Sequence, residues 1–308
     1  MAAIDIGSNT VRLLLGSVVR GQVVPSQYVR RITRLKGGQT DTGLSAEAIE
    51  RTLFALKEFS EIISRQPIDA IRVVGTEAVR SAANRRDFVA RVLNETGLRL
   101  EIVSGDEEAS LSASGVCSQF AAPVAGCLLV FDIGGGSTEF ILLQQGEILF
   151  QKSCQLGVVA LSESLSDFDH RHNFISAAIT EIFSTVEPIL KQLSITPEMI
   201  TLIGTAGTAT TLAALDMQMS DYDWRLVNGY TLDLNTIQSI YNRLDCLTVA
   251  EREELPGMEP GRGDLIPAGI EIIVEIIRQF RAAQLTVSDF GLLEGVLLSM
   301  STISRPND

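Results

Sequence analysis

Apolar residues in the first third of the chain recur first with the period of strands and then with that of helices. Helical spacing from Ile49 to Ile63 predicts a helix over 45–65, with Ser45 as its N-cap. Glycines without periodicity mark 30–43 as a long loop. Strands are expected at 2–6, 11–18, 22–28, 71–76 and 100–103, and further helices at 84–94 and 105–118.

The second half of the chain repeats this order of elements. Three antiparallel strands followed by alternating strands and helices predict an α/β fold with an RNase H-like sheet in each half. Pro188 lies inside a long helical pattern and is expected to kink or split that helix. The Ala-, Pro- and Gly-containing stretch 121–126 is the expected domain boundary. Strands are expected at 128–133, 138–144, 148–154, 199–203 and 284–287, and helices at 173–193, 208–215, 235–246, 265–281 and 291–302.

One short pattern occurs in both halves: an apolar run reaches Asp-Ile-Gly, small polar residues follow, and a second apolar run begins. It reads MAAIDIGSNT at 1–10 and FDIGGGSTEF at 131–140. A single glycine-rich turn of this kind is most simply an ordinary hairpin, but its recurrence indicates two similar domains. We expect Asp5 and Asp132 to face each other across one central cleft.

These turns combine groups that suit a phosphate and its metal. Glycines let a ligand approach the backbone closely, and their amides can surround an anion. The carboxylates of Asp132 and Glu139 bracket the second turn and suit a hard cation such as Mg²⁺. A third glycine-rich stretch, 204–215, joins a strand to a helix, and it suits an anion or close packing equally well.

The net charge of −13 is divided unevenly along the chain. Residues 1–104 carry 15 Lys and Arg against 11 Asp and Glu, whereas residues 105–308 carry 10 against 27. The first part can therefore attract an anionic ligand, while the overall acidity argues against binding to duplex nucleic acid. Because there is no run of 18 apolar residues and the first strand already contains Asp5, neither a membrane helix nor a signal peptide is expected.

The cysteines and histidines form no familiar disulfide or metal pattern. Cys117, Cys127, Cys154 and Cys246 are scattered, which fits free thiols in a reducing cytoplasm. His170 and His172 follow two aspartates, but their irregular spacing favours a solvated loop over a metal site.

Seven stretches along the chain form a recognisable set. They are IDIGSNT at 4–10, TGLSAEAIERTLFAL at 42–56, GTEAVRSAAN at 75–84, IVSGDEEA at 102–109, DIGGGSTE at 132–139, GTAGTATTLAAL at 204–215 and GRGDLIPAG at 261–269. In these motifs the chain resembles the exopolyphosphatase/guanosine pentaphosphate phosphohydrolase (Ppx/GppA) family, within the superfamily of acetate and sugar kinases, heat-shock chaperones and actin. The resemblance implies two RNase H-like (actin-like ATPase) domains around a central cleft, with the last helix returning to the first domain. The implied domains are 1–124 with 289–308, and 125–288.

The resemblance also implies roles for individual residues. Reasoning from the residues leaves Glu107 and Glu108 as candidate bases, and the family motif assigns the role to Glu108. Arg80 occupies the arginine of the family's Thr-x-x-x-Arg-x-x-x-Asn pattern, and is expected to contact phosphate. The expected metal ligands, for Mg²⁺ or alternatively Mn²⁺, are Asp5, Asp132 and Glu139, and the expected phosphate-binding residues besides Arg80 are Gly7, Ser8, Asn9, Thr10, Gly134, Gly135, Gly136, Ser137 and Thr138.

These observations favour a metal-dependent phosphoanhydride hydrolase that acts on inorganic polyphosphate or guanosine pentaphosphate. An ATP-dependent phosphotransferase and a non-catalytic, nucleotide-responsive hinge protein remain alternatives, and a homodimer stays open. Three positions depart from the family pattern, in which Arg, His and Arg are common. Ala160, Asn228 and Leu293 stand there, and the loss of positive groups leaves the preferred substrate undecided.

Overall fold

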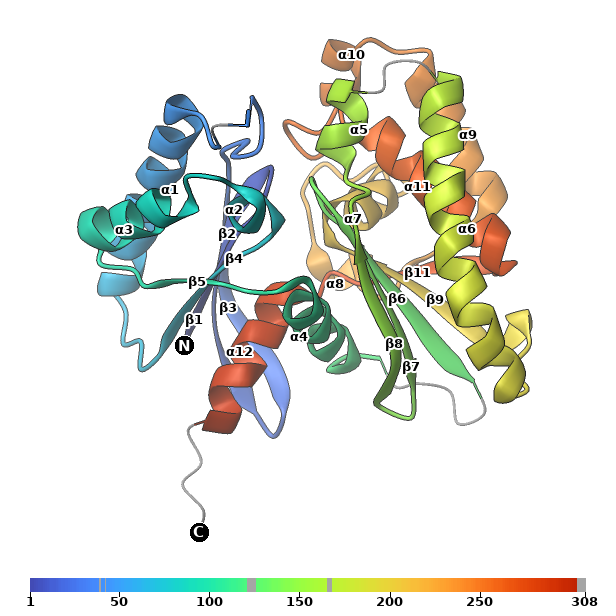
Figure 1. Cartoon of the computed structure of the whole chain (residues 1–308), viewed down its shortest axis with the longest axis horizontal. Coiled ribbons are helices and arrows are strands. Elements are labelled where there is room, and N and C mark those ends of the chain that lie inside the picture. The colour runs from blue at the N-terminus through green and yellow to red at the C-terminus, as the bar shows by residue number, and fades with distance from the viewer. Residues whose placement is uncertain (39, 42, 121–125, 165–167, 304–308) are drawn as a thin grey trace. The chain divides into compact units, whose positions relative to one another are not determined.

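The computed structural model describes residues 1–38, 40–41, 43–120, 126–164 and 168–303. The chain divides into two compact units (Figure 1). Unit 1 comprises Met1–Gln119 and Gly291–Asp308, and unit 2 comprises Phe120–Phe290. Residues 121–125 of the expected boundary lie outside the described residues.

Unit 1 is built on a five-stranded mixed sheet in the order β3-β2-β1-β4-β5. Alternate residues of β1 serve opposite faces, and Ile4 and Ile6 pack with Leu53 of α1 and Phe88 of α3. α12 packs on the other face and against α4 (Figure 1). The elements are β1 (Ala2–Ile6), β2 (Thr10–Val19), β3 (Gln22–Ile32), α1 (Ala46–Ser64), β4 (Ile71–Gly75), α2 (Glu77–Ser81), α3 (Arg85–Thr96), β5 (Leu100–Ile102), α4 (Gly105–Cys117) and α12 (Leu292–Ile303).

Unit 2 repeats this strand order in a six-stranded sheet, β10-β11-β9-β6-β7-β8. β6 is antiparallel to β7 and parallel to β9, as β1 is to β2 and β4. β10 is an additional antiparallel strand beside β11. The elements are β6 (Cys127–Ile133), β7 (Thr138–Gln144), β8 (Glu147–Cys154), α5 (Val158–Ser164), α6 (Phe168–Gln192), the 3-10 helix η1 (Pro197–Met199), β9 (Ile200–Thr205), α7 (Ala206–Asp216), α8 (Trp224–Val227), β10 (Thr231–Asp233), α9 (Leu234–Asp245), α10 (Val249–Glu253), α11 (Ile266–Phe280) and β11 (Gln284–Val287).

The expected RNase H-like α/β order is thus confirmed in both units. Two details of the N-terminal part were predicted wrongly. β3 continues through Ile32, because Thr10 to Arg12 of β2 pair with Arg30 to Ile32, so the loop begins later than residue 30. A short helix, α2, also follows β4, and it is too brief to produce a periodic pattern.

Of the two outcomes expected for Pro188, the split does not occur, because α6 is continuous from Phe168 to Gln192. A proline removes one backbone donor, and the fully buried Val186 and nearly buried Leu190 hold the segment in the core. His170 and His172 lie in this helix and not in a loop. Within the described residues, no helix is both long and apolar enough to span a membrane.

Candidate functional site

The two glycine turns have the same backbone construction. In unit 1, Gly7 N donates to Thr10 O at 3.0 Å, and in unit 2, Gly134 N donates to Ser137 O at 2.9 Å. The strand pairs that flank the turns are in equivalent register, so each Asp lies two residues before the glycine that begins the turn. The repeat detected in the sequence is therefore a repeat of structure.

The first turn exposes its amides on one side. Ser8 O accepts from Lys36 N at 3.0 Å, and Asn9 O accepts from Arg34 N at 2.9 Å. Because a trans peptide directs its carbonyl and the next N–H oppositely, the Asn9 and Thr10 amides point away from the segment that contains Lys36. The Asn9 side chain is 6% exposed, and neither its Oδ1 nor its Nδ2 has a hydrogen-bond partner among the described residues.

The second turn is held from behind by the start of α5. Val158 N donates to Gly134 O at 3.1 Å, and Val159 N donates to Gly135 O at 2.9 Å. The N–H groups of Gly135 and Gly136 therefore point away from α5, as an anion site requires. The hydroxyl of Thr138 donates to Leu156 O, so this side chain fastens β7 and only the neighbouring amides remain to face a phosphate.

The carboxylates beside the two turns have different cross-strand neighbours. Asp5 lies opposite Arg12, whose Nε and Nη2 donate to Asp5 Oδ2 at 2.9 and 2.6 Å. Asp5 is 2% exposed, and its buried Oδ1 has no hydrogen-bond partner in the described structure. At the equivalent position of unit 2, Asp132 lies opposite Glu139.

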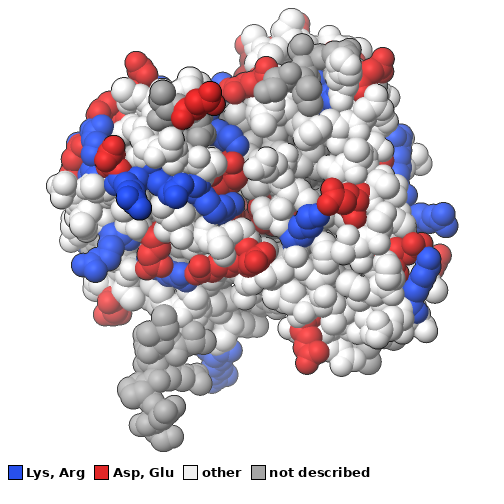
Figure 2. Space-filling view, viewed as in Figure 1, with Lys and Arg blue, Asp and Glu red and all other residues white. Residues whose placement is uncertain are grey.

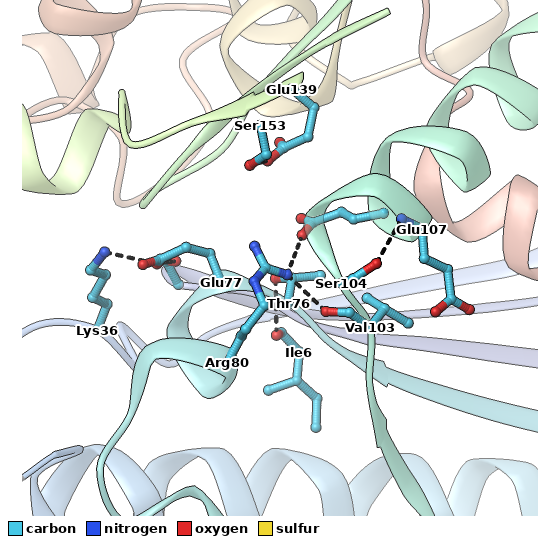
Figure 3. Close-up of polar contacts among 12 residues, drawn as sticks. Ile6, Lys36, Thr76, Glu77, Arg80, Val103, Ser104, Glu107, Glu139 and Ser153 are labelled. Atoms are coloured by element: carbon cyan, nitrogen blue, oxygen red, sulfur yellow. Dashed lines mark hydrogen bonds and ion pairs between the residues drawn. The ribbon is translucent and has the colours of Figure 1, made fainter. Parts of the chain in front are cut away.

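The Asp132–Glu139 pair fits a hard cation. Both side chains are nearly buried, and like charges directly opposite each other on adjacent strands are destabilising unless a counter-charge compensates them. Glu139 Oε1 accepts from Ser153 Oγ at 2.7 Å, which fixes its orientation (Figure 3). Mg²⁺ commonly uses one or two carboxylates and completes its shell with water and substrate phosphate. Within the described residues, no three His, Cys, Asp or Glu side chains gather as a complete metal set.

A chain of contacts links the first turn to α2. Thr76 N donates to Ile6 O at 3.2 Å, which places α2 at the end of β1. Ser8 Oγ donates to Glu77 Oε2 at 3.4 Å, and Lys36 Nζ lies 2.7 Å from the same oxygen (Figure 3). Lys36 thus contributes both its amide and its ammonium group to this site.

Arg80, one helical turn after Thr76, reaches the predicted base. Its Nη1 donates to Val103 O at 2.9 Å and to Glu108 Oε2 at 3.0 Å (Figure 3). The Glu108 residue is 8% exposed. The structure therefore brings the predicted phosphate contact and the predicted base together within unit 1.

The structure separates Glu107 from Glu108. Glu107 receives a hydrogen bond at 2.7 Å from Arg72, whose other nitrogens bind Glu101 and Ser299. Burial lowers the pKa of Arg72, but the hydrogen bonds and charges of Glu107 and Glu101 together outweigh burial and leave that pKa raised. The two adjacent carboxylates point at different partners, as expected of neighbouring helical positions about 100° apart.

The guanidinium of Arg262 lies against the glycine-rich stretch 204–215, and this contact was not predicted from the sequence. A Cβ on Gly207 would lie 1.7 Å from Nη2 of Arg262, so the guanidinium lies directly against this glycine. Arg262 also pairs with Glu259 at 2.7 Å. The motif GRGD at 261–264 draws attention to Arg262 in the sequence, but the contact between Arg262 and Gly207 depends on tertiary structure.

The comparisons with known proteins agree along the whole chain. A sequence profile described as the Ppx/GppA phosphatase family matches residues 22–303. Exopolyphosphatase 2 of Mycobacterium tuberculosis is 34% identical over 316 aligned residues, which cover 98% of each chain. The chain belongs to the Ppx/GppA phosphatase family.

Two solved structures show that the Ppx/GppA similarity extends to the fold. The Aquifex aeolicus family member is 29% identical, with a TM-score of 0.81 and coverage of 99% of this chain and 98% of that one. An exopolyphosphatase from Cytophaga hutchinsonii is 28% identical, with a TM-score of 0.87 and the same coverage. The fold is therefore that of this family.

The three departures from the Ppx/GppA pattern occupy ordinary structural positions. Leu293 is 2% exposed in α12, and Ala160 lies in α5. Asn228 Oδ1 accepts from Asp289 N at 3.1 Å. Positive charge for an anionic substrate must therefore come from other residues, such as Arg12, Lys36 and Arg80.

Proposed function

We propose that this family member is a Mg²⁺-dependent exopolyphosphatase that removes the terminal phosphoryl group of inorganic polyphosphate. The observation that carries the proposal is the Arg80–Glu108 pair, which unit 1 holds beside a glycine turn through Thr76. The similarity to exopolyphosphatase 2 of Mycobacterium tuberculosis supports the same reaction class.

In this mechanism, Glu108 orients a water molecule and takes its proton as the water oxygen bonds to the terminal phosphorus. The bond between that phosphorus and the bridging oxygen breaks, and the shortened chain leaves with its charge on that oxygen. Arg80 stabilises the non-bridging oxygens, and the turn amides fix the phosphates, because phosphoryl transfer depends mainly on positioning and charge stabilisation.

The metal is proposed from the chemistry of the carboxylates. Asp132 and Glu139 would hold Mg²⁺ directly or through water, and Asp5 would contribute its unpartnered Oδ1. The metal would neutralise charge on the substrate phosphates. Mn²⁺ has compatible oxygen ligands and is the alternative cation.

The deciding experiment is a phosphate-release panel with polyphosphates of several lengths, guanosine pentaphosphate and ATP, each with Mg²⁺ and with Mn²⁺. We expect metal-dependent release from polyphosphate, and the same chemistry would release the 5′-γ-phosphate of guanosine pentaphosphate. Turnover of ATP alone, with transfer to an acceptor, would instead favour a phosphotransferase. Ligand binding without turnover of any compound would contradict an enzymatic function.

A further inference from the structure

Positive charge gathers on one face of unit 1, over α2 and α3 (Figure 2). Arg91 of α3 is matched by Glu50 and Glu95, at 2.8 and 2.7 Å. Arg85 and Arg86, at the start of the same helix, are exposed, and within the described part of the chain neither pairs with a carboxylate. The unmatched charge therefore lies where α3 begins.

Many basic side chains of unit 1 are matched by carboxylates, on the strands, on α1 and on α2, whereas Arg85 and Arg86 are consecutive residues that are both unmatched among the residues that the structure describes. The matched pairs include Arg12–Asp5, Arg31–Glu58, Lys36–Glu77, Lys57–Glu95, Arg72–Glu101 and Arg80–Glu108.

Arg85 connects the exposed pair to the proposed catalytic residues. Its Nη1 donates to Arg80 O at 3.2 Å. The Arg80 side chain in turn donates to Glu108 Oε2 at 3.0 Å. Contacts therefore link Arg85 through Arg80 to the predicted base, and the exposed Arg86 is the next residue of α3.

Helix stability does not account for Arg85 and Arg86. They occupy the first two positions of α3, where the helix dipole disfavours cations. The N-cap residue Asn84 does not offset this unfavourable charge, because its side chain hydrogen-bonds to Leu44 N and O and not to the first turn of α3. A polyanion bound at this surface would attract both arginines and so compensate their unfavourable interaction with the helix dipole.

We infer that Arg85 and Arg86 extend the Arg80 site into a track for the internal phosphates of an inorganic polyphosphate chain whose terminal phosphate lies at Arg80 and Glu108. The inference rests on the proposed function and deepens it, because it makes long polyphosphate the preferred substrate over guanosine pentaphosphate. A chain that is charged at every phosphoryl group can engage successive arginines. Tripolyphosphate and guanosine pentaphosphate engage too few phosphates to use the exposed pair.

The test compares the Arg85→Gln/Arg86→Gln double variant with an Arg65→Gln/Arg99→Gln control. The control removes two exposed arginines from the same unit and changes the net charge equally. Direct binding of long-chain polyphosphate should weaken about tenfold in the track variant and little in the control. The slope of log Kd against log salt should become shallower by about 1.4, at about 0.7 for each lost phosphate contact.

Kinetics provide the second readout. The KM for long polyphosphate should rise in the track variant, with kcat and the KM values for tripolyphosphate and guanosine pentaphosphate unchanged. The melting temperature should stay equal or rise slightly, because the variant removes cations from a helix N-terminus.

Several results would overturn the track. These are an equal loss in the control, an equal loss for the short substrates, no change in polyphosphate binding, or tighter binding of RNA than of polyphosphate through the same arginines. Failure of the proposed function is distinguishable, since a wild type that binds long polyphosphate through these arginines but hydrolyses nothing would refute only the hydrolase.

Discussion

At the scale of single residues, the cations around the first glycine turn are already engaged with carboxylates. Each pair offsets the cost of placing charge in a half-buried position. A phosphate that binds here must therefore compete with these carboxylates for the cations. The pairs are Arg12–Asp5, Lys36–Glu77 and Arg80–Glu108.

The first prediction concerns the two adjacent glutamates. Glu108→Gln should lower kcat by about 10²–10⁴-fold with substrate binding retained, because an amide cannot take the proton of the attacking water. Glu107→Gln should have a much smaller effect, since Glu107 is bound by Arg72. Steady-state kinetics on polyphosphate with both variants measure the difference, and equal small effects would return both residues to the role of helix-end charges.

The second prediction concerns Lys36 and Glu77, whose side chains are 21% and 10% exposed. A double-mutant cycle with Lys36→Gln and Glu77→Gln should give a coupling free energy of about 1 kcal/mol in urea unfolding, above that of a typical surface pair. Lys57 and Glu95, which are 48% and 29% exposed, provide the matched comparison. If the Lys57 cycle shows the larger coupling, burial does not strengthen the Lys36 pair.

At the scale of elements, each turn depends on the segment that holds it from behind. Lys36 and its neighbours hold the first turn, and the start of α5 holds the second. The same hairpin backbone thus acquires different surroundings. Unit 1 places a basic residue, Arg12, opposite its Asp, and unit 2 places an acidic one, Glu139, at the equivalent position.

The third prediction concerns the contact behind the second turn. A Cβ on Gly157 would lie 2.3 Å from Gly136 C and 2.4 Å from Gly135 O, so Gly157→Ala must displace the backbone of the second turn, which we propose binds phosphate. We expect kcat/KM on polyphosphate to fall at least tenfold. Gly146→Ala is the control, because Gly146 has open space but φ of +85°, so that alanine should cost about 1 kcal/mol of stability without changing KM. Similar kinetics for the two variants would refute a positioning role for Gly157.

Local patterns made much of this architecture predictable. The strand–turn–strand repeat, the helix after Ser45 and the end of α3 at Gly97 are all specified by neighbouring residues. Helices α2, α5, α8 and α10 span four to seven residues and leave no periodic signal. The site residues that lie in contiguous motifs could be predicted from the sequence. The contact of Arg12 with Asp5 depends on strand register, and the contact of Lys36 with Glu77 joins residues 41 positions apart, so neither could be predicted.

At the scale of the whole molecule, the predicted metal set takes ligands from both units, and this remains a prediction. Asp132→Asn and Glu139→Gln should each weaken Mn²⁺ binding in calorimetric titration by at least tenfold, because each removes one anionic ligand. Asp5→Asn should weaken it less, since Arg12 already compensates that charge. An effect of Asp5→Asn that exceeds the other two would reverse this assignment and place the metal chiefly on unit 1.

The path of the chain has a consequence for synthesis. Unit 1 needs α12, which follows unit 2 in sequence and packs on α4 so closely that a Cβ on Gly295 would lie 1.9 Å from Leu111 O. When translation reaches residue 290, the sequence of every strand of unit 2 has been synthesised, but α4, which carries Glu107 and Glu108 in its first turn, still lacks its partner α12. Synthesis of unit 2 can thus be complete before α4 gains the helix that supports it, which happens only when α12 emerges.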